Sequence, residues 1–436
     1  MFRVLETSRF LHEIPEIKEI WDACYSQEKD DIYGTCLVTG TVQPIARIHN
    51  SVKGIRSDSL SPNGWTLVGF DKAAFCSYGK EQSYNAPVGK YAAFAYTTAL
   101  NYLLSDRGNV QHIGDTTVVC WAEGAEPQYQ DTFRSIFFDK EVPEGLKDSD
   151  LRSAVKRLAN GLPYDELKLD PARPFYILGL APNAARLSVR FFLRDTFGNL
   201  MKNINAHHER MEIVRPKTDP YSTLPLWAML RETVNMKSRD KAPSMKSWDK
   251  ALSPVMAGAV ARAIFTGGLY PASLLEAVML RLRAERDITP GRAAIIKAYY
   301  LKNENPLVPK EVLQVSLHEQ STNIPYTLGR LFSVLEDIQL RANPGINATT
   351  PGINATIKDK YFNSAASTPA MIFPLLNNLS EKHLRKLETG WRIHYEKQLY
   401  AVMGILPESY PPRLTLPEQG AFYLGYYHQT QKRYEK

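Results

Sequence analysis

The sequence predicts an α+β fold, in which a mixed α/β region with an antiparallel hairpin precedes an all-helical bundle. Apolar and polar side chains alternate through residues 187–194, as they do in a strand with one buried face. From residue 224 onward this strand pattern disappears, and apolar residues recur at helical spacing. We therefore expect two domains, a mixed region over residues 1–222 and a small-subunit-like helical bundle over 223–436.

The first region is predicted to begin with a helix. Ile17, Ile20 and Trp21 follow Pro15 at helical spacing, and proline is tolerated in a first helical turn. A turn-rich stretch then precedes a second helix over about Val88–Leu104, and Thr116–Trp121 reads as a short buried strand.

The hairpin is the clearest strand signal. An apolar run at 175–178 precedes the alternating segment, and Ala181-Pro182-Asn183 is the predicted turn between them. The residues expected on the buried face of the second strand are Leu187, Val189, Phe191 and Leu193.

Helix signals dominate the rest of the chain. The predicted helices cover about residues 223–235, 253–266, 271–286, 289–302, 324–342, 369–404 (interrupted) and 416–433. Thr289 is an expected N-cap, with Pro290 at the first helical position. The polar segment 237–247 and a duplicated PGINAT motif at 344–349 and 351–356 are expected to form loops.

Composition and cysteine usage point to a cytoplasmic protein with a sizeable core. The chain has 436 residues, of which 44% are hydrophobic. No apolar run approaches the roughly 18 residues of a membrane span, and the charged N-terminus lacks an apolar signal core. The four cysteines form no CxxC pair, so we expect reduced thiols.

Positive charge is concentrated in one segment. Between Met236 and Lys302 there are 12 Lys and Arg against 5 Asp and Glu, an excess of +7 that equals the net charge of the whole chain. A local basic surface favours contact with a polyanion, because each cation placed on a phosphate releases condensed counterions. A solvated basic helix face without a ligand is the other interpretation.

The helix at about 272–287 carries the main candidate contacts. An apolar stripe is predicted to face the core, with basic residues at its edges, and neighbouring antiparallel helices could gather further cations into one groove for a phosphate backbone. The predicted backbone contacts are Arg262, Arg281, Arg283, Arg286, Arg292, Lys297 and Lys302.

Catalytic motifs are mostly absent from the sequence. It contains no phosphate-binding loop, no GxSxG and no HExxH. His207 and His208 are adjacent, so on a helix they point about 100° apart and could not easily share a metal. Cys36, a turn glycine and His49-Asn50 resemble the opening of a His-Asn-His nuclease, although His49 is more typical of a buried structural histidine. We expect no catalytic residue, no metal and no cofactor.

Long strings along the chain resemble the large subunit of the type I-C CRISPR surveillance (Cascade) complex. They are CLVTG at Cys36, PIARIHNSVKGIR ending at Arg56, SYGKEQSYNAPVGKYAAFAYTTALNYLL from Ser77, and GGLYPASLLEAVMLRLRAERDITPGRAAIIKAYYLKN from Gly267. YTLGRLFSVLEDIQ, PGINATIKDKYF and QGAFYLGYYHQ continue the similarity.

The resemblance implies a non-catalytic role in antiviral defence. Such subunits sit at one end of a filament that carries the crRNA, beside the filament backbone subunits, the crRNA-processing subunit and a small subunit. They hold target DNA strands during R-loop formation and help recruit a helicase–nuclease, while base pairing reads most of the sequence. No membrane partner is implied.

Two further expectations follow from the resemblance. Family members are normally longer at the N-terminus, so we expect the domain for flanking-motif recognition to be missing and assign that role to no residue. Lys53 and Arg56 are predicted to contact guide RNA or a neighbouring subunit. The alternatives are a metal-dependent nuclease built on Cys36 and His49, or a purely structural subunit whose basic helices pack against acidic protein surfaces.

Overall fold

The fold is that of a computed structural model. It describes residues 10, 14–25, 31–56, 63–70, 72–106, 110–124, 126–138, 148–184, 186–219, 224–235, 252–345, 352 and 354–434. Internal contacts divide the chain into two compact units. The first unit contains Met1–Trp121 and Ile177–Phe192, and the second contains Ala122–Tyr176 and Leu193–Lys436. The predicted helix after Pro15, the second helix and the strand at 116–121 are all confirmed in the first unit.

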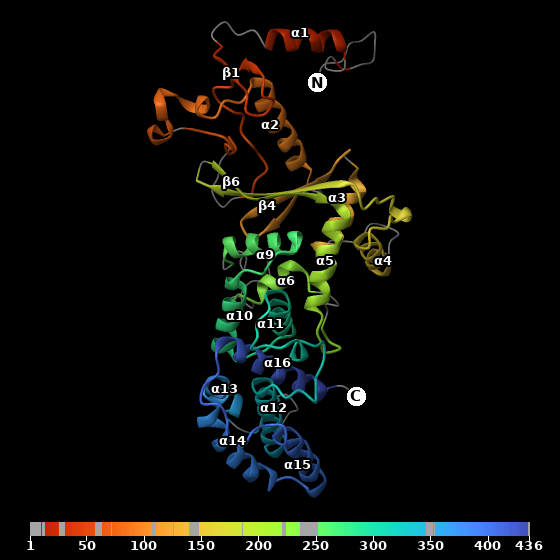
Figure 1. The fold of residues 1–436 in the computed structure, drawn as a ribbon, viewed down its shortest axis with the longest axis vertical. Coiled ribbons are helices and arrows are strands. Elements are labelled where there is room, and N and C mark those ends of the chain that lie inside the picture. Colours follow the sequence, from red (N-terminus) through yellow and green to blue (C-terminus); the bar gives the residue numbers. More distant parts are fainter. Residues whose placement is uncertain are drawn as a thin grey trace. The chain divides into compact units, whose positions relative to one another are not determined.

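The first unit is built from short elements around one long helix (Figure 1). Its elements are α1 (Pro15–Tyr25), β1 (Tyr33–Thr35), β2 (Val42–Pro44), α2 (Lys90–Ser105), β3 (Val110–Ile113) and β4 (Thr116–Ala122). Strands β1 and β2 pair antiparallel, with Gly34 opposite Gln43. The core of this unit joins α2, through Leu100 and Leu104, to Val119 of β4 and to Trp65.

The predicted hairpin is present as β5 (Pro174–Asn183) and β6 (Arg186–Thr196). These strands lie side by side in the sheet order β3-β4-β5-β6, and their two-residue connection makes them antiparallel. The predicted turn position is wrong, because β5 continues through Asn183 and the chain reverses at Ala184, which has a left-handed φ of 52°. Val189 is also not on a buried face, since 51% of it is exposed on the edge strand β6.

Three helices of the second unit that precede residue 223 were not predicted from the sequence. They are α3 (Pro127–Phe137), α4 (Asp148–Ala159) and α5 (Phe197–Met211). Two of these carry a recognisable start signal, namely Pro127 in the first turn of α3 and the Thr196 hydroxyl, which accepts a hydrogen bond from the Asn199 N–H as the N-cap of α5. Helices α4 and α5 pack against each other.

The helices expected beyond residue 223 are confirmed with small changes. They are α6 (Leu226–Arg231), α9 (Pro254–Thr266), α10 (Ala272–Glu285), α11 (Pro290–Asn303), α12 (Ile324–Ala342), α14 (Pro369–Leu384), α15 (Thr389–Met403) and α16 (Leu416–Lys432). Helix α6 is shorter than predicted, and the interrupted stretch 369–404 divides into α14 and α15. Helix α13 (Ile357–Ser367), which begins at a Thr356–Asp359 capping box, was not expected.

Some predictions stay untested. The loop at 237–247 and residues 346–351 and 353 of the PGINAT repeat lie outside the described residues. The domain boundary after residue 222 also stays a prediction. The compact units follow a different division, in which α3, α4 and α5 belong with the later helices.

The centre of the second unit is the close packing of α12 against α16 (Figure 1). Each helix contributes a glycine at the point of closest approach. A Cβ on Gly329 would overlap the carbonyl oxygen of Phe422, and a Cβ on Gly425 would overlap the carbonyl oxygen of Tyr326. The two backbones therefore touch directly. No helix within the described ranges is both long and apolar enough to cross a bilayer.

Aromatic rings fill the space beside this helix pair. Phe332 of α12, Phe362 of α13, and Phe422 and Tyr426 of α16 pack edge-on or tilted against one another. Helix α13 is thereby joined to the centre of the second unit.

Candidate nucleic-acid interface

The predicted contacts on α10 lie on two different sides of the helix. Its apolar stripe, which begins with Leu274, Leu275 and Val278, is buried. Residues two positions apart on a helix point about 160° apart, so Arg281 and Arg283 border opposite edges of this stripe. The two arginines accordingly have different partners, and the sequence-predicted cations are not gathered onto one surface.

Arg292 was predicted to contact a phosphate backbone, but in the structure it lies inside the second unit and is not exposed for such a contact. Its side chain is 0% exposed and forms ion pairs with Glu285 and Glu232, the second at 3.5 Å from Nε. Its Nη1 also donates to the carbonyl oxygen of Asp287 at 2.8 Å. Arg281 joins the same network through Glu285, at 3.7 Å. These cations balance protein carboxylates, as a buried arginine requires.

Lys297 is also buried, so its predicted contact with a phosphate is corrected for the same reason. Only 2% of the residue is exposed, and its Nζ donates to the carbonyl oxygens of Arg210 at 3.0 Å and Glu212 at 2.7 Å. Burial lowers the pKa of Lys297 to about 8, partly opposed by the charge of Glu212. The ammonium thus ties α11 to the carbonyl groups at the end of α5.

The remaining predicted residues lie at or near the surface of their own units. In the second unit, Arg262 of α9 is exposed and Lys302 in the last turn of α11 is half-buried. In the first unit, Lys53 is exposed and Arg56 is half-buried. The backbone N–H of Lys53 donates to Asn101 at 2.8 Å, which fixes this loop against α2.

A basic cluster forms where the end of α10 meets α13. It consists of Arg283, Arg286 and Lys358, and we call it the α10–α13 cluster. The side-chain amide of Asn363 on α13 donates to the carbonyl oxygen of Arg283 at 2.8 Å, which joins the two helices. Hydrogen bonds from Thr356 lower the pKa of Asp359, and the nearby charges of Arg286 and Lys358 lower it further. Lys358 was missed because its helix was not predicted.

The two arginines of the α10–α13 cluster are held differently. Arg283 is exposed, and its Nη2 donates to Gln419 of α16 at 2.9 Å. Arg286 is the C-cap of α10 and adopts a left-handed conformation with φ of 55°, while its N–H donates to the carbonyl oxygen of Leu282. The left-handed cap ends α10 and leaves the Arg286 side chain exposed.

The residues of the alternative nuclease site are engaged in the core of the first unit. Cys36 is 0% exposed, and its sulfur accepts hydrogen bonds from the N–H groups of Gly89 at 3.2 Å and Val38 at 3.4 Å. Burial raises the pKa of this thiol, but the hydrogen bonds, led by that of Gly89, outweigh it and lower the pKa to about 7.

His49 fits the interpretation as a buried structural histidine. It is 3% exposed, and its Nδ1 lies 2.7 Å from the hydroxyl oxygen of Tyr96. Burial lowers the pKa of His49, so the ring is neutral near pH 7. Among the described residues, no group of three His, Cys, Asp or Glu side chains could hold a metal ion.

The comparisons with known proteins agree with a role in a CRISPR system. The family model described as CRISPR-associated protein (Cas_Csd1) matches residues 1–434. No curated protein matches the chain. Because the family model covers nearly the whole sequence, the chain belongs to the CRISPR-associated Cas_Csd1 family.

Proposed function

We propose that this protein is the large subunit of a type I-C CRISPR surveillance complex and that it is not an enzyme. In this role it holds target DNA strands while the guide RNA pairs with its target, and it supports recruitment of a helicase–nuclease. Membership of the Cas_Csd1 family supports a place in a CRISPR complex with other Cas subunits. The α10–α13 cluster is the observation that supports a grip on nucleic acid.

Charge balance at the α10–α13 cluster favours a polyanionic ligand. The carboxylate of Asp359 lies close enough to Arg286 and Lys358 for their charges to lower its pKa, and it is already engaged in the capping box of α13. Phosphate groups can supply further negative charge, and their binding releases counterions into solution. Arg283 uses one N–H for Gln419, and a guanidinium has further N–H groups to offer.

Reversing two charges of this cluster is expected to weaken DNA binding. With Arg283→Glu and Arg286→Glu together, we expect the affinity for a single-stranded oligonucleotide to fall about tenfold or more at low salt. The slope of log affinity against log salt should become shallower by about 1.4, because two phosphate contacts on a single strand are lost. Fluorescence anisotropy of a labelled strand, titrated at about 50 to 200 mM salt, measures both quantities.

The matched control carries the same change of charge elsewhere in the second unit. Lys202 and Lys217 are exposed and lie outside the cluster, so the Lys202→Glu, Lys217→Glu variant should keep most of the wild-type affinity. The α10–α13 cluster would not be a DNA contact if the Arg283→Glu, Arg286→Glu variant kept the wild-type salt slope, or if the control variant lost as much affinity for the oligonucleotide.

A structural role for the first unit is favoured by its exposed apolar side chains. Around the β1–β2 ribbon, Leu37, Val38 and Val42 are 68–71% exposed, and Tyr33 is 62% exposed. Neighbouring apolar residues at a surface are typical of a protein–protein contact. The unit can therefore dock against another subunit of the complex, as a scaffold would.

The scaffold role predicts a specific loss of assembly. We expect Val42→Asp to reduce recovery of the other subunits at least severalfold when the complex is co-expressed and purified, because a charge would be buried in the contact. Val255→Asp is the control, since this residue of the second unit is 67% exposed. Equal recovery with both variants would count against a contact at the β1–β2 ribbon.

A further inference from the structure

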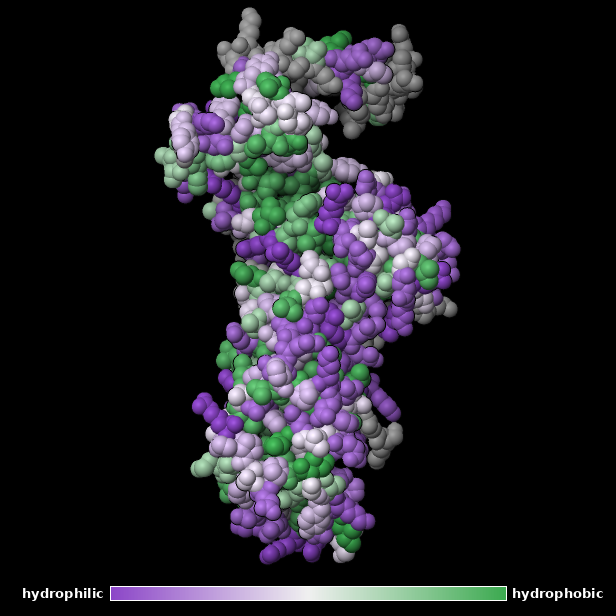
Figure 2. Space-filling view, viewed as in Figure 1, coloured by the Kyte–Doolittle hydropathy of each residue, from purple (hydrophilic) through white to green (hydrophobic). Residues whose placement is uncertain are grey.

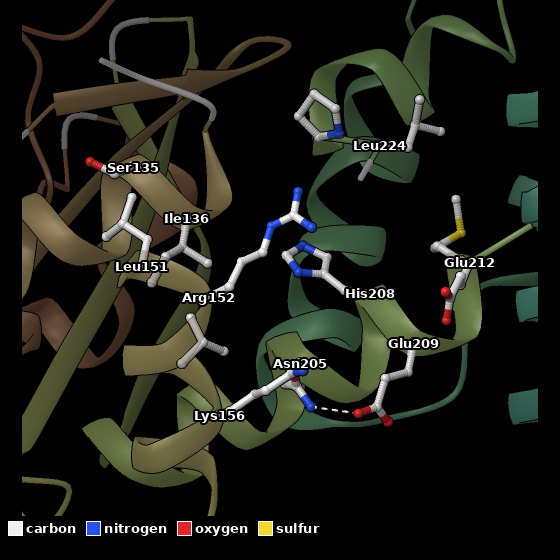
Figure 3. A pocket seen from close by; sticks show the side chains of 13 residues that line it. Ser135, Ile136, Leu151, Arg152, Lys156, Asn205, His208, Glu209, Glu212 and Leu224 are labelled. Carbon is white, nitrogen blue, oxygen red and sulfur yellow. Dashed lines mark hydrogen bonds between the residues drawn. The ribbon is translucent and has the colours of Figure 1, made fainter. Parts of the chain in front are cut away.

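The second unit contains a pocket that the proposed grip on DNA does not use. Its volume is about 390 Å³, and it lies between α3, α4, α5 and the start of α6 (Figure 3). Its lining consists of Ser135, Ile136, Leu151, Arg152, Val155, Lys156, Asn205, His208, Glu209, Met211, Glu212, Leu224 and Pro225. The surface over α4 and α5 is mostly hydrophilic on the face that Figure 2 shows. A pocket of this size is large enough for a small organic ligand.

The lining carries charges of both signs. Arg152 and Lys156 are four residues apart on α4, so they share one face of the helix. Glu209 and Glu212 lie on the side of α5, where the amide of Asn205 donates to Glu209 at 2.7 Å (Figure 3). A ligand that fits must offer negative charge to the two cations and hydrogen-bond donors to the two carboxylates.

His208 lies beside the cationic wall. Figure 3 shows its ring and the guanidinium of Arg152 reaching toward each other across the pocket. Burial, together with the positive charge of Arg152, lowers the pKa of His208 to about 4. An anion placed between the two side chains would offset that charge and could accept a hydrogen bond from the imidazole.

We propose that this pocket binds one nucleotide of a single-stranded nucleic acid. The phosphodiester would lie against Arg152, Lys156 and His208. Amino groups of the base or hydroxyl groups of the sugar would donate to Glu209 and Glu212. The apolar side chains of the lining, Leu151, Leu224 and Pro225, would cover the base or the sugar.

Other ligands fit the lining less well. Inorganic phosphate alone would leave the apolar wall uncovered. An acidic peptide would bring further negative charge to Glu209 and Glu212, which costs binding energy. The inference rests on the proposed contact with nucleic acid but concerns separate residues, so the two can fail independently.

The test uses the full chain and a dinucleoside monophosphate, cytidylyl-cytidine or its deoxy form, whose single phosphodiester mimics a strand. Saturation-transfer NMR should show contact to base protons. The Arg152→Gln, Lys156→Gln variant should weaken binding about tenfold or more, through loss of charge-assisted hydrogen bonds. Lys217→Gln with Lys397→Gln removes the same charge at exposed positions outside the lining and should leave the affinity unchanged.

The pH dependence provides a second readout. Binding of an anion raises the pKa of His208, so affinity should increase as the pH falls from about 8 to about 5, a range in which the phosphodiester does not titrate. The other charged groups that line the pocket are Arg152, Lys156, Glu209 and Glu212. His208→Gln should make the affinity independent of pH over this range.

Several outcomes would overturn the inference. They are no saturable binding of the dinucleotide, equal affinity in the Arg152, Lys156 variant, and binding of inorganic phosphate or an acidic peptide that is as tight as that of the dinucleotide. The Arg283→Glu, Arg286→Glu variant separates this test from the proposed function. If that variant loses affinity for long strands but still binds the dinucleotide, the pocket binds its ligand independently of the α10–α13 cluster. If the Arg283→Glu, Arg286→Glu variant loses affinity for long strands while the Arg152→Gln, Lys156→Gln variant binds the dinucleotide like the wild type, the proposed function stands and the inference about the pocket fails.

Discussion

Replacing Gly425 by alanine is expected to lower the melting temperature of the second unit by about 6 °C or more. The added Cβ would overlap the carbonyl oxygen of Tyr326, a backbone atom of α12 that cannot rotate away. The helices must therefore move apart, at a cost of about 3 kcal/mol. Thermal unfolding of the full chain, followed by far-ultraviolet circular dichroism, measures the effect.

The sign of the change in melting temperature distinguishes the effect of helix propensity from that of the backbone contact. Alanine favours a helix over glycine by up to about 1 kcal/mol, so propensity alone predicts stabilisation. Gly390 in the first turn of α15 is the control, because a Cβ there would meet nothing within 4 Å. Gly390→Ala should leave the melting temperature unchanged or raise it. A wild-type melting temperature for Gly425→Ala would contradict the direct backbone contact of α12 and α16.

Arg292→Met is expected to destabilise the second unit by about 3 to 5 kcal/mol. Methionine fills much of the same volume, but it leaves Glu232 and Glu285 without the buried cation that balances them. The measurement is again the melting temperature, combined with the salt dependence of DNA binding below the transition. We expect the melting temperature to fall and the salt dependence of DNA binding to stay unchanged.

The comparison with an exposed arginine separates packing from ligand binding. Arg262 on α9 is exposed, so Arg262→Met should change stability by less than about 0.5 kcal/mol. If Arg292→Met instead melted like the wild-type chain and lost DNA affinity, Arg292 would be a ligand contact after all.

The elements that could be predicted from the sequence are those with strong local signals. Thr289 followed by Pro290 marks the start of α11, and the alternating residues of 187–194 mark β6. Helix α5 also had a signal, since Leu200, Ile204 and Met211 are buried at helical spacing behind its N-cap. It was missed because the polar residues between these three, including two adjacent histidines, weaken the apolar pattern.

The candidate site could be predicted only in part, for a physical reason. Arg283 and Arg292 look equivalent in the sequence, yet one is exposed and the other is buried. Arg292 pairs with Glu285, seven residues before it, and with Glu232, which is 60 residues before it and reaches it only in the folded chain. Charge counts locate a basic segment, but long-range pairing decides which of its cations remain available.

The left-handed backbone conformation at Arg286 implies a trade-off between folding stability and the binding of a polyanion. A side chain in a left-handed conformation costs about 1 kcal/mol that glycine would not, so Arg286→Gly would make a better helix end and a sturdier protein. The same exchange would remove a cation from the α10–α13 cluster. Selection for stability alone would therefore favour glycine at this position. An arginine here is expected if the chain accepts a lower folding stability in exchange for a cation that binds a polyanion.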